Sequence, residues 1–226
     1  MNEIYETIGK FLLVVFIAVC FVIAAALLLL IAPAFVETTM PSNSYAIKIT
    51  GLSGLAVNET ATIMIPIPAN AAGVPAMSEE VLTGRYQAFG WRTSIRKTPY
   101  GKMLAFTTAE RYAPDLSISS GEFETKEEPR LLVPVLATPG NVSATEFTRT
   151  SSGTYTTVVF LDGFVPPSEN TTPISFNLRY RGGGGMKHLI KEDTWTATVN
   201  TTVPGAESGF IPVPAGYHVT PGGIYL

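Results

Sequence analysis

Hydrophobic and polar positions divide the chain into one long apolar stretch and a longer region of alternating residues. No charged side chain occurs from Phe11 to Val36. Within that stretch, Phe11 to Ala32 reads FLLVVFIAVCFVIAAALLLLIA and would make a helix about 33 Å long, enough to cross the hydrocarbon of a bilayer. A core helix would be shorter and would carry a polar stripe, which these residues lack. The pattern therefore predicts a transmembrane anchor over residues 11–36.

The charges that flank this stretch set its expected direction. Lys10 stands just before it, and no Lys or Arg follows until Lys48. Because cytoplasmic flanks are enriched in Lys and Arg, the N-terminus should lie inside the cell. We therefore expect a cytoplasmic tail over residues 1–10, a polar linker over residues 37–44 and an extracellular domain over residues 45–226.

Other interpretations of the apolar stretch are weaker. Ala32-Pro33-Ala34 is similar to a signal-peptidase site, but a cleaved signal has an apolar region of only about 7 to 15 residues, so a retained anchor is favoured. A lipoprotein signal is excluded because Val19 precedes Cys20 and the apolar run continues beyond it. A pilin-like filament subunit remains an alternative, although Gly9-Lys10 reverses the order of the pilin processing signal.

Beyond the linker, the period of the pattern is two, which is typical of β-strands. Apolar residues alternate with polar ones at 45–50 and again at 60–65. Residues 91–96 and 102–108 alternate on either side of Thr98-Pro99-Tyr100-Gly101, whose turn chemistry predicts a hairpin. Only Met77 to Leu82 indicates a short helix. Further strands are expected at 116–123, 130–136, 155–161, 174–180 and 194–203.

About eight or nine strands separated by Gly, Pro and Asn loops predict a mostly β fold, an antiparallel β-sandwich. An immunoglobulin-like arrangement is compatible with this pattern, but the cysteine pair typical of it is absent from the sequence. The long polar loop at 137–152 leaves a division into two lobes open, with one domain favoured. Gly182 to Gly185 is expected to form a turn, because the Lys-Ser or Lys-Thr of a phosphate-binding loop does not follow it.

Charge and cysteine content narrow the partners and the compartment. Lys plus Arg total 15 and Asp plus Glu total 18, a net charge of -3 without long blocks of one sign, so no nucleic-acid footprint is present. Cys20 is the only cysteine, which leaves the expected outer domain without disulfides and favours a microbial cell surface. The predicted hairpin carries a basic patch that we interpret as a solvated face, and an acidic run further on could pair with it: Arg92, Arg96, Lys97 and Lys102, then Glu122, Glu124, Glu127 and Glu128.

Four tripeptides match the acceptor pattern for N-glycosylation, more than the composition would give by chance. All four lie on the side of the anchor predicted to be outside the cell, in expected loops or strand ends. We predict that glycans, where present, occur only at the four acceptor residues Asn58, Asn141, Asn170 and Asn200.

Residues for enzymatic chemistry do not assemble in the sequence, so we predict no catalytic, cofactor-binding or metal-binding residues. His188 and His218 are far apart, and neither has a His or Cys at metal-ligand spacing. Glu192-Asp193 is an adjacent pair, and adjacent side chains on a strand point to opposite faces. Gly directly follows Ser53, which departs from the spacing of a nucleophile elbow.

Two aromatic features have both a structural and a binding interpretation. Trp91 and Trp195 could stack on sugar rings, but their aliphatic neighbours favour core packing. The segment from Phe210 to Leu226 has three prolines and no charged side chain. We expect it to form an edge strand, with docking on a partner or on the membrane as the alternative.

A long signal anchor followed by a Thr-rich, Cys-free domain with acceptor tripeptides resembles archaeal membrane-anchored cell-surface proteins. The resemblance lies in the plan of the whole chain and implies no functional residues. It favours a non-enzymatic structural or interaction protein, in contact with the lipid bilayer and with other envelope proteins or copies of itself. A pilin-like filament subunit and an accessory or sugar-binding domain of a membrane complex are the alternatives. For the sugar-binding domain, an exposed aromatic cluster is expected.

Overall fold

The computed structural model of the chain divides into two units, Met1–Met40 and Pro41–Leu226. It describes residues 10, 13, 15–27, 43–70, 74, 75, 77, 79–119, 131–133, 135–137, 152–165, 172–187, 190–205 and 207–224. In the first unit, residues 15–27 form a continuous helix of exposed side chains. No helix among the described residues is long and apolar enough to span a membrane. Much of the predicted anchor, including residues 28–36, lies outside the described residues.

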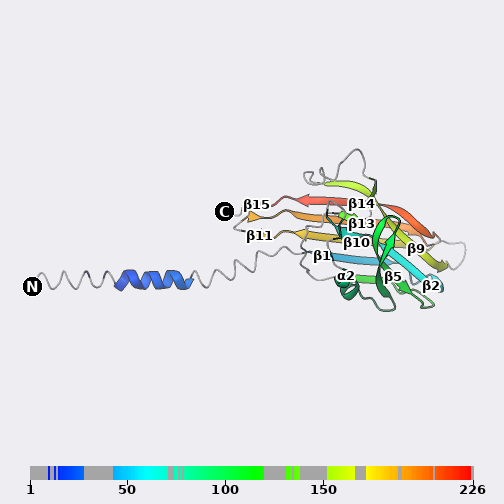
Figure 1. Cartoon of the computed structure of the whole chain (residues 1–226), viewed down its shortest axis with the longest axis horizontal. Coiled ribbons are helices and arrows are strands. Elements are labelled where there is room, and N and C mark those ends of the chain that lie inside the picture. The colour runs from blue at the N-terminus through cyan, green and yellow to red at the C-terminus, as the bar shows by residue number, and fades with distance from the viewer. Residues whose placement is uncertain are drawn as a thin grey trace, which may run out of the picture. The chain divides into compact units, whose positions relative to one another are not determined.

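The described residues of the second unit are mostly in strands (Figure 1). Its one described helix is α2 (Glu79–Arg85), close to the short helix that the sequence predicts at Met77 to Leu82. The strands are β1 (Ser44–Thr50), β2 (Ala56–Ile65), β3 (Ile67–Ala69), β4 (Arg92–Thr98), β5 (Gly101–Thr108), β6 (Leu116–Ser119), β7 (Leu131–Val133), β8 (Val135–Ala137), β9 (Ser152–Val165), β10 (Pro173–Gly183), β11 (Met186–Lys187), β12 (Ile190–Lys191), β13 (Thr194–Pro204), β14 (Gly209–Thr220) and β15 (Gly223–Ile224).

Ten of these strands form one antiparallel sheet. Its order is β4-β5-β2-β9-β14-β13-β10-β1-β6, and β8 also pairs with β9. Two small sheets, β11-β12-β15 and β3-β7, complete the pairing. The structure confirms the mostly β class and the β4–β5 hairpin. The sequence predicted two packed sheets. The described strands instead form one continuous curled sheet, because the long strand β9 pairs with β14 on one side and with β2 on the other.

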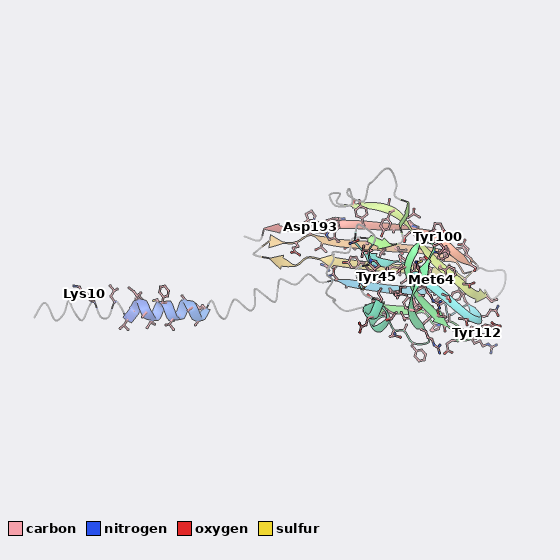
Figure 2. All side chains as sticks on the ribbon, viewed as in Figure 1. Lys10, Tyr45, Met64, Tyr100, Tyr112 and Asp193 are labelled. Atoms are coloured by element: carbon pink, nitrogen blue, oxygen red, sulfur yellow. The ribbon has the colours of Figure 1, made fainter. Side chains whose placement is uncertain are left out.

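The curl places both ends of the sheet around one hydrophobic core. Ile47 on β1 and Phe106 on β5, near opposite ends of the strand order, belong to the same buried cluster. Buried hydrogen bonds join these parts. The hydroxyl of Tyr45, labelled in Figure 2, donates to the Pro66 carbonyl at 2.7 Å, and the Tyr86 hydroxyl donates to the Tyr45 carbonyl at 3.3 Å. Alternate side chains of the long described strands, such as β1, β10 and β13, therefore face one shared core.

The C-terminal strand corrects one prediction. β14 was expected at an edge, but it lies between β9 and β13. Its pairing with β13 covers only Ala215 to Thr220, whereas its pairing with β9 begins at Gly209. Pro212 and Pro214 precede the shared region. They lack an N–H group; they lie in register with Val158 and Thr156 of β9, and they fall where β14 has no described partner on the β13 side.

Candidate functional site

A second, smaller apolar cluster lies on the side of the sheet opposite the core. Met64, Met103, Ala105 and Val158 are buried there. Strand alternation explains the cluster, because their sequence neighbours, such as Ile63 and Leu104, point into the main core. We call this side of β4, β5, β2, β9 and β14 the outer face.

Aromatic side chains extend this cluster toward the solvent. The rings of Phe160 on β9 and Phe210 on β14 are tilted, with centroids 4.7 Å apart. Tyr100, from the turn between β4 and β5, meets the Phe210 ring edge to face at 5.0 Å and is 45% exposed (Figure 2 labels Tyr100). We call these three residues the aromatic cluster. It joins a hairpin turn to two strands that are distant in the sequence.

The turn that carries Tyr100 is held by its own hydrogen bonds. The Thr98 hydroxyl donates to the Gly101 carbonyl at 2.8 Å and accepts from the Tyr100 N–H at 3.2 Å. Gly101 has a φ of 123°, which a residue with a side chain rarely adopts. These features fix the turn and place the Tyr100 ring against Phe210.

A hollow of about 400 Å³ opens beside the cluster, and we call it the aromatic hollow. Its charged residues are Arg96, Lys97 and Asp162, all exposed. Asp162 accepts a hydrogen bond from the Ser208 hydroxyl at 3.1 Å, which holds the carboxylate in place. The lining combines aromatic, hydroxyl and charged groups: Thr62, Met64, Arg96, Lys97, Thr98, Pro99, Phe160, Asp162 and Phe210.

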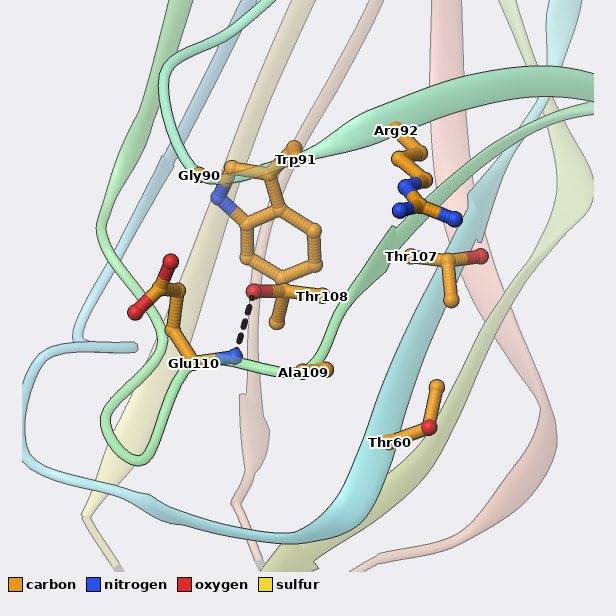
Figure 3. Close-up of a pocket in the computed structure, with 8 residues that line it drawn as sticks. All are labelled: Thr60, Gly90, Trp91, Arg92, Thr107, Thr108, Ala109 and Glu110. Carbon is orange, nitrogen blue, oxygen red and sulfur yellow. Dashed lines mark hydrogen bonds between the residues drawn. The ribbon is translucent and has the colours of Figure 1, made fainter.

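A second hollow, of about 480 Å³, lies nearer the other end of the β4–β5 hairpin, and we call it the Trp91 hollow. The close-up in Figure 3 shows Arg92 beside Thr107, and Trp91 beside Thr108. The Trp91 indole N–H donates to the Pro114 carbonyl at 3.0 Å. The dashed line in Figure 3 is the bond from the Glu110 N–H to the Thr108 hydroxyl, 3.2 Å long. The remaining lining residues are Thr60, Gly90 and Ala109.

The structure places two of the four predicted glycosylation residues. Asn58 and Asn200 are both exposed, as are Thr60 and Thr202, which complete their acceptor tripeptides. Asn200 lies inside β13, paired with Asn177, and not in a loop or at a strand end as the sequence suggested. The pairing of β13 with β10 continues through Thr201 and Thr202 to Pro204. Asn141 and Asn170 lie outside the described residues.

The other candidate residues are not brought together. His218 is exposed on β14, and His188 lies outside the described residues. Ser53 is exposed, and its N–H bonds to the Asp115 carboxylate at 3.3 Å. Trp91 and Trp195 are each 5% exposed and belong to the core, as the sequence favoured. Among the residues that the structure describes, no group of three or more His, Cys, Asp or Glu side chains could hold a metal ion.

The basic patch lies where the sequence placed it. Arg92, Arg96, Lys97 and Lys102 are all exposed on the β4–β5 hairpin. Glu122, Glu124, Glu127 and Glu128 lie outside the described residues. Sequence reasoning missed the aromatic cluster, because the pairing of β9 with β14 brings Phe160 and Phe210 together. The signal available in the sequence was Tyr100, an aromatic residue in a turn, where Gly, Pro, Asn, Asp and Ser dominate.

No family model matches the chain, and neither a curated protein nor a solved structure matches it.

Proposed function

We propose that the chain is a non-enzymatic protein of the cell surface, tethered by residues 11–36, with its β domain outside the cell and glycosylated. The observation that carries the proposal is the charge-free stretch from Phe11 to Val36 ahead of the β domain. A stretch of that length and composition partitions into a bilayer. Its partners are the lipid bilayer and other envelope proteins or copies of the chain.

The glycosylation part of the proposal is supported by exposure. A glycan needs an acceptor Asn that is accessible, and Asn58 and Asn200 meet that condition. Because neither side chain packs in the core, a sugar at either position would leave the buried clusters intact. The exposed polar positions around Asn200 on β10 and β13 are compatible with such a solvated surface.

Labelling of single cysteines on intact cells tests the tether. In a Cys20→Ala background, Ser53→Cys puts a thiol on an exposed position of the domain, and Asn2→Cys puts one in the expected cytoplasmic tail. A membrane-impermeant maleimide should label S53C on intact cells and N2C only after lysis. Labelling of S53C only after lysis would overturn the proposal. Intact mass separates the filament alternative, which requires loss of a leader ending near Lys10.

A sugar-binding ectodomain is a second candidate, and the aromatic cluster favours it. The aromatic hollow is concave and combines apolar rings with a few convergent polar groups, as ligand sites do. Sugar rings present C–H groups that pack on aromatic faces and hydroxyls that bond to Asp162 or Thr62. Titration of the purified chain with an uncharged tetrasaccharide, fully methyl-esterified tetragalacturonate, tests this candidate. Phe210→Ala should weaken the binding, and binding unchanged in F210A would exclude the site.

A further inference from the structure

The two hollows lie next to each other on the outer face. Thr60 lines the Trp91 hollow, and Thr62, two residues along the same strand, lines the aromatic hollow. Thr62 is also the cross-strand partner of Thr107, which lines the Trp91 hollow. Residues two apart on a strand point to the same face. The hollows therefore form two parts of one surface.

Strand register arranges that surface into a polar row beside an apolar row. Directly paired residues lie on one face of a sheet, so each row can be followed across the strands. The polar row crosses β4, β5, β2 and β9 as Arg92, Thr107, Thr62 and Asp162. The apolar row lies two residues along and consists of Ala105, Met64, Phe160 and Phe210, with Ser94 of β4 at its edge.

Positive charges lie in and beside these rows. Arg92 and Arg96 lie on the same face of β4, about 13 Å apart at the rise of a strand, and both are exposed. Lys97 also lines the aromatic hollow. The acids that line the two hollows are Glu110 and Asp162. Three cations against two carboxylates give the surface a net positive charge, although the chain as a whole is negative.

We propose that the outer face binds an acidic oligosaccharide, a chain of uronic-acid sugars that spans both hollows. The inference deepens the second candidate function above, and rests on it, by naming the ligand class and its footprint. Sugar C–H faces pack on the apolar row and on the aromatic cluster. Sugar hydroxyls bond to Thr62, Thr107 and Asp162. Carboxylates of two separate sugars along the chain pair with Arg92 and Arg96, whose planar guanidinium groups bind carboxylates through two parallel hydrogen bonds.

A single-stranded nucleic acid would also use aromatic and basic groups, but the observations favour the sugar. Both ligands carry a negative charge on every unit, so Glu110 and Asp162 repel the two alike, and the sugar is favoured by its hydroxyl groups. The same carboxylates accept hydrogen bonds from sugar hydroxyls. The hydroxyl-bearing threonines add donors and acceptors that suit a polyhydroxylated ligand.

Isothermal titration of the purified full-length chain in detergent tests the inference. The probes are tetragalacturonate, its fully methyl-esterified form and a tetrathymidylate. The acid should bind about tenfold more tightly than the ester, about 1.4 kcal/mol for the charge. Arg96→Gln should reduce that preference while it leaves ester binding unchanged, because Arg92 still pairs with a carboxylate. Lys48→Gln is the matched control, because Lys48 is exposed on β1 and lines neither hollow.

A second measurement tests whether the ligand spans both hollows. Arg92→Gln should weaken the tetramer but leave digalacturonate unchanged, since a disaccharide fills only the aromatic hollow. Equal losses in R96Q and K48Q would overturn the site, and so would tighter binding of tetrathymidylate than of tetragalacturonate. If acid and ester bind equally and R96Q has no effect, the acidic ligand is wrong and the sugar-binding candidate stands. Failure of the acid and the ester alike overturns both, and none of these results bears on the tether.

Discussion

Tyr45→Phe tests the closure of the sheet around its core. The substitution removes a single hydroxyl, which donates to the Pro66 carbonyl at 2.7 Å. Both residues are buried, so the carbonyl would lose a partner that water cannot readily replace. The bond joins β1 to Pro66, which directly follows β2, and β1 and β2 are far apart in the strand order.

The loss of stability in Y45F follows from the cost of leaving a buried carbonyl without a donor, about 1 to 3 kcal/mol. In a domain of this size, 1 kcal/mol shifts Tm by roughly 2 to 4 °C. We therefore expect Y45F to lower Tm by about 2 to 12 °C, and to lower the denaturant midpoint without changing the slope m.

Circular dichroism of the purified chain during thermal and urea unfolding measures both quantities. Tyr112→Phe is the matched control, because Tyr112 is 56% exposed and the loss of its hydroxyl should change stability by less than about 0.5 kcal/mol. If Y45F and Y112F unfold at the same temperature, the Tyr45 hydroxyl does not secure the curl, and the reasoning is refuted. A changed m would show instead that the substitution alters compactness.

Three further predictions follow from the same structure. Burial, with smaller effects from Tyr86 and Tyr155, raises the pKa of Tyr45 above its ordinary value. The stabilising contribution of Tyr45 is therefore complete below about pH 10 and declines as the pH rises further. The free energy of unfolding should fall less steeply with alkaline pH in Y45F. Gly163→Ala should lower the free energy of unfolding by more than about 1 kcal/mol, because φ is +79° and the new Cβ would lie 2.0 Å from the Thr60 carbonyl oxygen. Gly84→Ala in α2 is the control: its Cβ meets no atom within 4 Å, so it should be neutral or stabilising in the same urea titration. Peptide mass spectrometry of the native glycoprotein should find sugar at Asn58 or Asn200, and their occupancy should fall to zero in Thr60→Val and Thr202→Val respectively; sugar persisting in those variants would contradict the acceptor assignment.

Local pattern predicted much of the β domain. Alternation located β1 and β13, and turn chemistry at Pro99 and Gly101 located the β4–β5 hairpin, since both signals depend on neighbours in the chain. Burial followed the same alternation, and Trp195 is in the core as expected.

Long-range pairing was not predictable in the same way. Nothing local to β14 indicates that it lies between β9 and β13, and its prolines suggested an edge. The aromatic cluster depends on that pairing, because Phe210 meets Phe160 only when the two strands are neighbours. A single sequence also gives no signal that a long strand such as β9 continues one sheet instead of starting a second.

The pairing of β1 with β10 has a consequence for biosynthesis. Asn43 and Tyr180, which share a hydrogen bond beside these strands, are 137 positions apart. At the usual pace of a ribosome, on the order of ten seconds separate the emergence of the first strand from that of its neighbour. During that interval the earlier strand has no β10 to pair with and must be shielded from other nascent chains. We therefore expect that the domain cannot complete its sheet until its last third has been made, that its folding is slow, and that it depends on chaperones meanwhile.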